Sequence, residues 1–312
     1  MKIATNVLEA IGNTPLVELR RVAPPGGGRV VVKLEGANPT GNMKDRMARA
    51  AIEAAEADGR LQPGSTVVEY TGGSTGASLA LVCAAKGYGL KIVTSDAFSE
   101  EKTRTTLAFG AQIVSIPSDN RQITEELIRN MIDTAQRINQ EPQHWWFDQL
   151  NNRDAASGYH SMGEEIWNQT EGKVDALVQS VGSAHSLNGV MEVLRKRNPD
   201  LYVAAVEPAE SAILSGRSKG SHRIEGIGIG FIPPHWQPDK VNAIESATTE
   251  EAAQMCRRLA REEGIFAGIS SGLNVIAALR VAERLGPEAT VATIMIDSGL
   301  RYLSTEVYRK DQ

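Results

Sequence analysis

The sequence has 312 residues, of which 41% are hydrophobic, so it can bury a large core as one α/β unit or, as we expect, as two domains. Its 33 basic and 38 acidic residues give a net charge of −5, and without a Lys/Arg run this balance argues against a nucleic-acid partner. No segment has the apolar length of a membrane span, and Met1 to Gly12 lacks the parts of a signal peptide. We therefore expect a cytoplasmic protein that binds a small molecule, without a membrane partner.

Residues 30–35 form the first clear strand, and a loop with Gly, Asn and Pro follows it. A helix should then begin near Met43 and end at Asp58-Gly59, which places Lys44 in its first turn. The helix dipole disfavours a cation there. Two interpretations stay open: a solvated lysine beside Asp45, or a lysine whose lowered pKa makes its amine a nucleophile or base.

Strands and helices alternate from residue 65 onward. Strands are expected at 66–71, 91–95, 112–117, 176–181, 202–206 and 290–297, and helices at about 75–86, 99–109, 122–139, 155–170 and 186–197. The stretch 207–239 is irregular, and two further helices flank the glycine-serine turn 268–272. This alternation predicts an α/β fold of mostly parallel sheets flanked by helices, with two sheets that meet near residues 140–155.

Two strand-to-helix loops are rich in Gly, Ser and Thr. The first is Thr71 to Gly76 and the second is Gly182 to Ser186. In open α/β sheets ligands bind at such loops, where backbone amides and hydroxyls meet anions. We assign the first loop to a carboxylate and the second to a phosphate, although simple helix capping by Ser74 or Ser183 would explain either loop alone.

Other site signatures are weak or missing. Gly36 to Lys44 is a near miss to a P-loop, and Gly226 to Gly230 lacks dinucleotide-binding spacing. Cys83 and Cys256 lie in Ala/Leu-rich helical patterns and are expected to be core thiols. The five histidines show no metal-ligand spacing, so no metal site is predicted.

A candidate Schiff-base lysine, a carboxylate-type loop, a phosphate-type loop and a late Ser-Ser-Gly turn together suggest a pyridoxal phosphate enzyme. Over almost its whole length the chain resembles the cysteine synthase / cystathionine β-synthase family of fold-type II (tryptophan synthase β-like) enzymes. The stretches that carry the resemblance are 11–16, 38–46, 71–76, 147–149, 163–167, 206–208, 222–228, 268–272 and 297–304.

The resemblance implies a role for each part of the chain. Residues 41–150 would form a smaller, mobile domain that binds the substrate carboxylate, and residues 1–40 and 151–312 a larger domain that carries the phosphate loop. Lys44 would bind pyridoxal 5'-phosphate as a Schiff base, and Ser270 would hydrogen-bond its pyridine nitrogen. The phosphate would be cradled by Gly182, Ser183, Ala184, His185 and Ser186, and the substrate carboxylate by Thr71, Gly72, Gly73, Ser74, Thr75 and Gln149. Ser74 aligns with an asparagine that touches the cofactor's phenolic oxygen.

The chain also departs from the family pattern. Gly72 and Ser74 replace a serine and an asparagine of the carboxylate loop, and Ala184 and His185 replace two glycines of the phosphate loop. Leu300 and Asn42 stand where glutamate and serine are usual. His185 could contact the phosphate or donate a proton near the site, or it could face solvent.

Three functions remain open. The leading one is β-replacement on an activated serine, of the O-acetylserine or O-phosphoserine type, through an aminoacrylate intermediate, with a thiol or sulfide as nucleophile, as in cysteine biosynthesis. The second is a β-elimination lyase such as a cysteine desulfhydrase, and the third is a non-catalytic relative that binds a metabolite or a partner. The resemblance also implies a homodimer.

Overall fold

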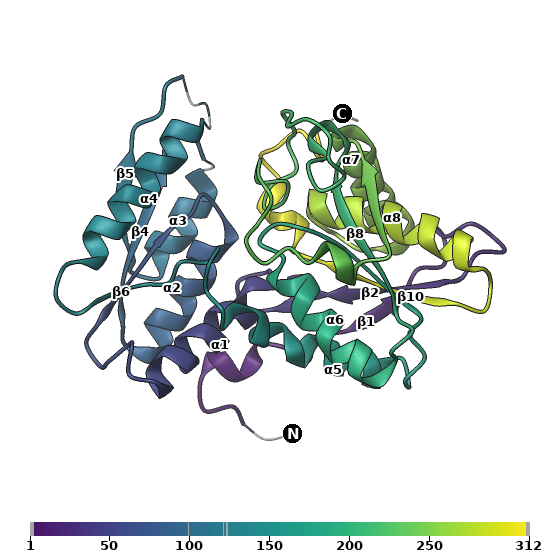
Figure 1. Ribbon diagram of the computed structural model, residues 1–312, viewed down its shortest axis with the longest axis horizontal. Coiled ribbons are helices and arrows are strands. Elements are labelled where there is room, and N and C mark those ends of the chain that lie inside the picture. Colours follow the sequence, from purple (N-terminus) through teal and green to yellow (C-terminus); the bar gives the residue numbers. More distant parts are fainter. Residues whose placement is uncertain (1–2, 99, 121, 123, 310–312) are drawn as a thin grey trace. The chain divides into compact units, whose positions relative to one another are not determined.

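The computed structural model describes residues 3–98, 100–120, 122 and 124–309, which divide into two compact units (Figure 1). Unit 1 comprises Met1–Ile11 and Lys44–Gly158, and unit 2 comprises Gly12–Met43 and Tyr159–Gln312. The expected division placed residues 1–40 together, whereas the segment up to Ile11 packs with unit 1. Within that segment Leu8 is buried, and its carbonyl oxygen accepts a hydrogen bond from Arg49 Nη1 at 2.8 Å.

Unit 1 is built on a sheet of four parallel strands in the order β5-β4-β3-β6. The strands are β3 (Thr66–Tyr70), β4 (Gly89–Ser95), β5 (Gln112–Ile116) and β6 (His144–Trp146). The helices are α1 (Lys44–Ala57), α2 (Ser74–Lys86), α3 (Glu100–Ala108) and α4 (Glu125–Asn139), after the short 3-10 helix η1 (Val7–Ala10). The predicted start of α3 at Ser99 lies outside the described residues.

Helix α4 covers one face of this sheet. Val68 of β3 and Val93 of β4 pack against Leu127 and Met131 of the helix. Side chains alternate along a strand, so the neighbours of these valines point to the other face, and α2 packs on β3 and β4. Thr124 caps α4 by accepting a hydrogen bond from the Leu127 N–H at 3.1 Å.

Unit 2 is built on a six-stranded sheet in the order β1-β2-β10-β7-β8-β9, in which only the β1–β2 pair is antiparallel. The strands are β1 (Leu16–Glu18), β2 (Arg29–Leu34), β7 (Ala176–Ser180), β8 (Tyr202–Pro208), β9 (Ala243–Ala247) and β10 (Thr290–Met295). The longer helices are α5 (His160–Gln169), α6 (His185–Arg197), α7 (Thr249–Arg258) and α8 (Ile269–Leu285). Short helical turns are η2 (Glu35–Ala37), η3 (Ala155–Tyr159), η4 (Ala209–Ser211), η5 (Pro238–Lys240), the π-helical η6 (Leu259–Glu263) and η7 (Gly299–Tyr302).

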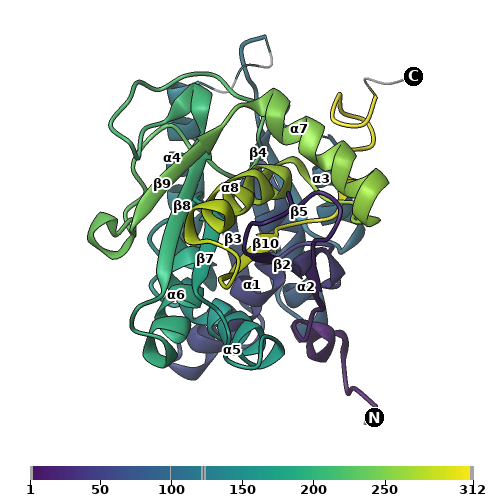
Figure 2. The ribbon, with the colours of Figure 1, turned by 90° about the vertical axis from the view of Figure 1, so that its right-hand side faces the viewer.

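Helices cover both faces of the six-stranded sheet. Figures 1 and 2 show α7 and α8 on one side of the sheet and α5 and α6 on the other. Val30, Val178 and Val206 from three strands form one buried cluster with Leu273 and Val281 of α8. Because β7, β8 and β10 are parallel, their carboxyl ends share one edge, where the loop that begins at Gly182 follows β7.

The predicted α/β architecture of mostly parallel sheets is therefore confirmed, with local differences. The expected helix over 155–170 is a 3-10 turn followed by α5, which begins only at His160. The turn 268–272 is not a loop, because α8 already begins at Ile269. Gly268 is its extended N-cap residue, and the Ser271 N–H donates to the Gly268 carbonyl oxygen at 3.0 Å. Strands β1, β6 and β9 were not predicted.

Candidate active site

Lys44 is the first residue of α1 and is half-buried. The residue before it, Met43, belongs to unit 2, where its N–H donates to the Ile296 carbonyl oxygen at 2.9 Å. Asp45 is buried and accepts a hydrogen bond from the Ser78 hydroxyl of α2 at 2.6 Å. Lys44 is thus neither fully exposed nor fully buried, and its functional role stays a prediction.

The predicted carboxylate loop joins β3 to α2 in unit 1. Its first residue, Thr71, donates its N–H to the Val93 carbonyl oxygen at 3.0 Å and accepts the Gly73 N–H on its hydroxyl at 3.0 Å. The Thr75 hydroxyl donates to the side-chain oxygen of Gln149. Gly73, the N-cap residue of α2, provides no side-chain cap for the first backbone N–H groups of the helix, and such groups are able to bind an anion. Unit 1 thus brings together the loop and Gln149.

A buried carboxyl group beneath this loop was missed in the sequence. Glu69, at 1% exposure, accepts the Tyr70 N–H at 3.0 Å and the Gln149 N–H at 3.1 Å. Burial raises the pKa of the Glu69 carboxyl well above its ordinary value, although these two backbone hydrogen bonds oppose the shift. Glu69 therefore positions Gln149 at the loop. An acidic residue within an apolar strand, just before a glycine loop, was the available signal.

The predicted phosphate loop joins β7 to α6 in unit 2. A side-chain carbon on Gly182 would overlap the Gly226 carbonyl oxygen, so only glycine fits there. Ala184, the N-cap residue of α6, has a left-handed φ of 68° and provides no side-chain cap. The Ser186 hydroxyl accepts a hydrogen bond from the Gln179 side-chain amide at 2.6 Å. The loop is therefore held tightly against its own unit, with the start of α6 left uncapped by side chains.

His185 does not face solvent. It is 1% exposed, and its ring lies 4.6 Å, centroid to centroid, from the ring of His235 at an interplanar angle of 44°. Asn188, one turn further along α6, donates its side-chain N–H to the His235 carbonyl oxygen at 2.8 Å. The expectation that this histidine could point into solvent is wrong, because the segment that contains His235 covers the start of α6.

Ser270 lies in the first turn of α8 and is 1% exposed. Asn274, one turn later, accepts the Ser180 N–H at 2.7 Å and donates to the Ile294 carbonyl oxygen at 2.9 Å. These bonds tie the start of α8 to the carboxyl ends of β7 and β10. Unit 2 therefore brings the turn of Ser270 and the strand that carries the phosphate loop to the same edge of the sheet.

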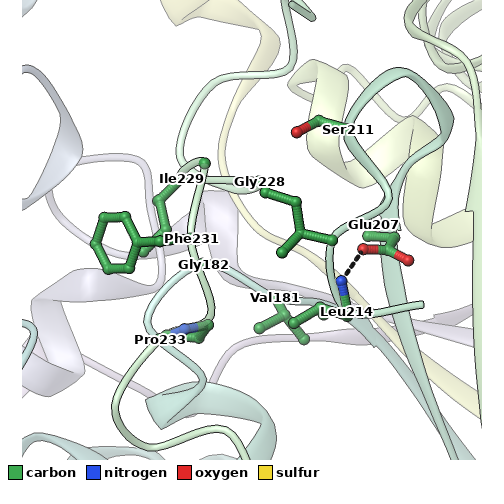
Figure 3. A pocket seen from close by; sticks show the side chains of 11 residues that line it. Val181, Gly182, Glu207, Ser211, Leu214, Gly228, Ile229, Phe231 and Pro233 are labelled. Atoms are coloured by element: carbon green, nitrogen blue, oxygen red, sulfur yellow. Dashed lines mark hydrogen bonds between the residues drawn. The ribbon is translucent and has the colours of Figure 1, made fainter. Parts of the chain in front are cut away.

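A small cavity of about 10 Å³ lies beside the phosphate loop (Figure 3). Val181 and Gly182 line it together with Glu207, which accepts the Leu214 N–H at 2.7 Å. This volume holds about one water molecule, so the cavity is too small for a cofactor.

Neither a membrane-spanning helix nor a metal-binding cluster is found among the described residues. Among them no helix is long and apolar enough to cross a membrane, and no group of three or more His, Cys, Asp or Glu side chains could hold a metal ion. Cys83 and Cys256 are both buried free thiols, and burial raises the pKa of each to about 12. They are core residues, as predicted.

A family match covers most of the chain. Residues 7–297 match the family described as pyridoxal-phosphate dependent enzyme. The chain belongs to this family. The predicted dependence on pyridoxal phosphate and the predicted fold-type II architecture are thereby confirmed.

Individual members of the family are similar along the whole chain. A cysteine synthase from Staphylococcus aureus is 40% identical over 313 residues, which cover 99% of each chain. The crystal structure of O-acetyl serine sulfhydrylase isoform 3 from Entamoeba histolytica superimposes with a TM-score of 0.93 at 37% identity, covering 100% of this chain and 93% of that one. That of an O-ureido-L-serine synthase gives a TM-score of 0.90 at 34% identity, covering 100% and 97%.

The residues of unit 2 fit the phosphate end of the pyridoxal phosphate cofactor. Helix α6 begins without a side-chain cap, and a helix N-terminus attracts an anion. At the end of β7, Gln179 Oε1 and Ser180 Oγ are buried without a hydrogen-bond partner among the described residues. Gly182 leaves no room for a side chain. This edge of unit 2 therefore has donors and unsatisfied polar atoms for a phosphorylated, polar ring.

Proposed function

We propose that this pyridoxal phosphate enzyme catalyses β-replacement on an activated serine, of the O-acetylserine or O-phosphoserine type, with sulfide or a thiol as the incoming nucleophile. The observation that carries the proposal is the 40% identity to a cysteine synthase over 99% of both chains. Lys44 at the start of α1 and the two uncapped helix starts of α2 and α6 support it.

The proposed roles of the residues follow the two units. In unit 2 the phosphate would be held by the backbone N–H groups and hydroxyls of Gly182, Ser183, Ala184, His185 and Ser186, and the pyridine nitrogen by the Ser270 hydroxyl. In unit 1 the substrate carboxylate would be held by Thr71, Gly72, Gly73, Ser74, Thr75 and Gln149, and Ser74 would also contact the cofactor. Residues 41–150 would form the domain that moves as substrate binds.

Lys44 would act twice. Its Nζ would hold the cofactor, and its amine would accept the proton from the Cα of bound substrate. When bound, the cofactor would supply an electron sink for the charge left at Cα. Ser270 would offer the ring nitrogen a hydroxyl and not a carboxylate, which would suit prompt loss of the leaving group over a long-lived carbanion.

We also propose, from the family resemblance, that the chain acts as a homodimer in the cytoplasm in cysteine biosynthesis. Light scattering coupled to size exclusion, on purified holoenzyme, would measure the mass of the particle. Twice the chain mass of 33.6 kDa is expected, and a mass equal to that of one chain would contradict the dimer.

The reaction is tested by adding O-acetylserine, O-phosphoserine and cysteine in turn to the holoenzyme while its visible spectrum is recorded and pyruvate is assayed. We expect a serine donor to change the cofactor absorbance and sulfide to restore it, with cysteine as the product. Pyruvate release from cysteine without added nucleophile would replace the proposal with a lyase. A protein without cofactor absorbance would contradict both.

A further inference from the structure

Gly72 of the carboxylate loop is packed directly against the ring of Phe98. A side-chain carbon placed on Gly72 would lie under 3.0 Å from Cγ, Cδ1 and Cε1 of this ring. Real Cβ atoms do not come that close to other atoms. The backbone of Gly72 is not left-handed, so an alanine would be excluded here by the ring and not by its own φ.

Phe98 is positioned through its backbone and its side chain. Its backbone N–H donates to the Ser95 carbonyl oxygen at 3.2 Å, in the turn that follows β4. The ring also packs on the buried cluster that contains Val68 and Val93 of the sheet. Because the clash involves Cγ as well as the outer ring atoms, a small rotation of the ring would not relieve it.

Strand β4 leads into the turn that contains Phe98 and also forms a hydrogen bond to the loop. Val93 of β4 accepts the Thr71 N–H at 3.0 Å, two residues before the turn at Ser95 begins. The loop and the ring are therefore positioned against each other by the same strand end. The space that a side-chain carbon at position 72 would fill is here filled by the aromatic ring.

We infer that Gly72 and Phe98 form a matched pair that positions the carboxylate loop, with Phe98 as a positioning residue for substrate-carboxylate binding. The carboxylate role of the loop rests on the proposed function. The pair explains why this chain has no side chain at position 72. The ring of Phe98 sets the path of the loop backbone, and the backbone amides of the loop then bind the carboxylate with no contribution from a side chain at this position.

The test is a double-mutant cycle on the holoenzyme with Gly72→Ala, Phe98→Ala and the double variant. Calorimetry would measure binding of L-serine, whose hydroxyl is a poor leaving group, and of L-serine methyl ester, which has no carboxylate. Gly72→Ala should weaken L-serine binding about tenfold, because the added methyl overpacks the ring. Phe98→Ala should weaken it about threefold, and the double variant should return to within about threefold of the parent.

Two controls separate positioning from general damage. Affinity for the methyl ester should stay within about twofold in every variant, since the loop amides have no carboxylate to hold. Gly27→Ala adds a methyl at a loop glycine of unit 2, where the nearest atoms would lie 3.8 Å from the added Cβ. This variant should change the affinity neither for L-serine nor for its methyl ester.

The pair is contradicted if Gly72→Ala leaves L-serine binding unchanged, if the double variant does not recover, or if the ester loses affinity to the same extent. If Gly72→Ala does not fold, the double variant decides, because it must then fold and bind L-serine like the parent. A parent enzyme that binds the ester as tightly as L-serine would instead contradict the carboxylate role of the loop, and with it the proposed function.

Discussion

The two ligand loops of this enzyme share a plan and differ in how firmly they are built. Each follows a parallel strand and leads into a helix whose start has no side-chain cap. Both loops begin half-exposed, but burial starts earlier in the phosphate loop: Ala184, His185 and Ser186 are buried after two half-exposed residues, whereas four residues, Thr71 to Ser74, are half-exposed before Thr75 is buried. The difference matches their proposed ligands: a cofactor that stays bound suits a rigid cradle, and a substrate that comes and goes suits an accessible loop.

One glycine in each loop, Gly72 and Gly182, is crowded by neighbouring atoms, and the two are crowded by different kinds of atom. Gly182 is confined by a backbone oxygen, that of Gly226, and Gly72 by the side chain of Phe98. A side chain can be shortened by substitution and a backbone oxygen cannot. Crowding at the carboxylate loop should therefore be reversible by mutation, and crowding at the phosphate loop should not.

The largest effect is expected at Lys44, the proposed Schiff-base lysine. Lys44→Ala should reduce turnover about a thousandfold or more and remove the visible absorbance of the covalently held cofactor. The far-UV circular dichroism spectrum should not change, because Lys44 is only half-buried. Lys196→Ala, at an exposed surface lysine paired with Glu192, is the matched control. Turnover that persists in Lys44→Ala would eliminate the proposed role.

Gly182→Ala should weaken cofactor binding about tenfold to a hundredfold, because the added methyl overlaps the Gly226 carbonyl oxygen. Equilibrium dialysis against pyridoxal phosphate would measure the affinity. Unchanged cofactor affinity would show that the backbone around Gly182 can shift to accept a side chain, which would contradict a rigid phosphate loop.

His185→Ala should lower the free energy of unfolding by about 1 to 2 kcal/mol, since it removes a buried ring packed against His235. His235→Phe keeps a ring in contact and serves as the control. Urea titrations of both variants would measure the change. Equal stability of His185→Ala and the parent would mean that the two rings do not stabilise the start of α6.

A smaller, pH-dependent effect on the free energy of unfolding is expected from Glu69 in unit 1. Its pKa is raised in the folded state, so folding binds a proton, and stability falls as pH rises from the ordinary carboxyl pKa toward the raised value. Glu69→Gln cannot ionise and should lack this fall. Urea unfolding between about pH 5 and pH 8 should thus show a difference in stability that shifts in favour of Glu69→Gln as pH increases. Parallel pH profiles for the two proteins would contradict the shift.

The sequence predicted those parts of the site that local pattern controls. The start of α1 at Lys44, the loop between β3 and α2 and the loop between β7 and α6 each follow from a strand, a glycine-rich break and a helical period in one short stretch. These signals lie within about ten residues of one another, so no knowledge of the tertiary fold is needed to detect them.

What the sequence did not predict depends on contacts between distant segments. His185 is buried by His235, 50 positions later, and Phe98 occupies the space next to Gly72. Glu69 reaches Gln149 across the sheet. Strand β6 has three residues and β9 lies at a sheet edge, so their pairing with the sheet, and not their own pattern, defines them.

The most direct measurement is a crossed comparison of Gly72→Ala and Gly182→Ala in two titrations, one with pyridoxal phosphate on the apo protein and one with L-serine at saturating cofactor. We predict that Gly182→Ala loses mainly cofactor affinity and that Gly72→Ala loses mainly L-serine affinity, restored by Phe98→Ala. If both variants lose the same ligand to the same extent, the two loops do not have separate roles.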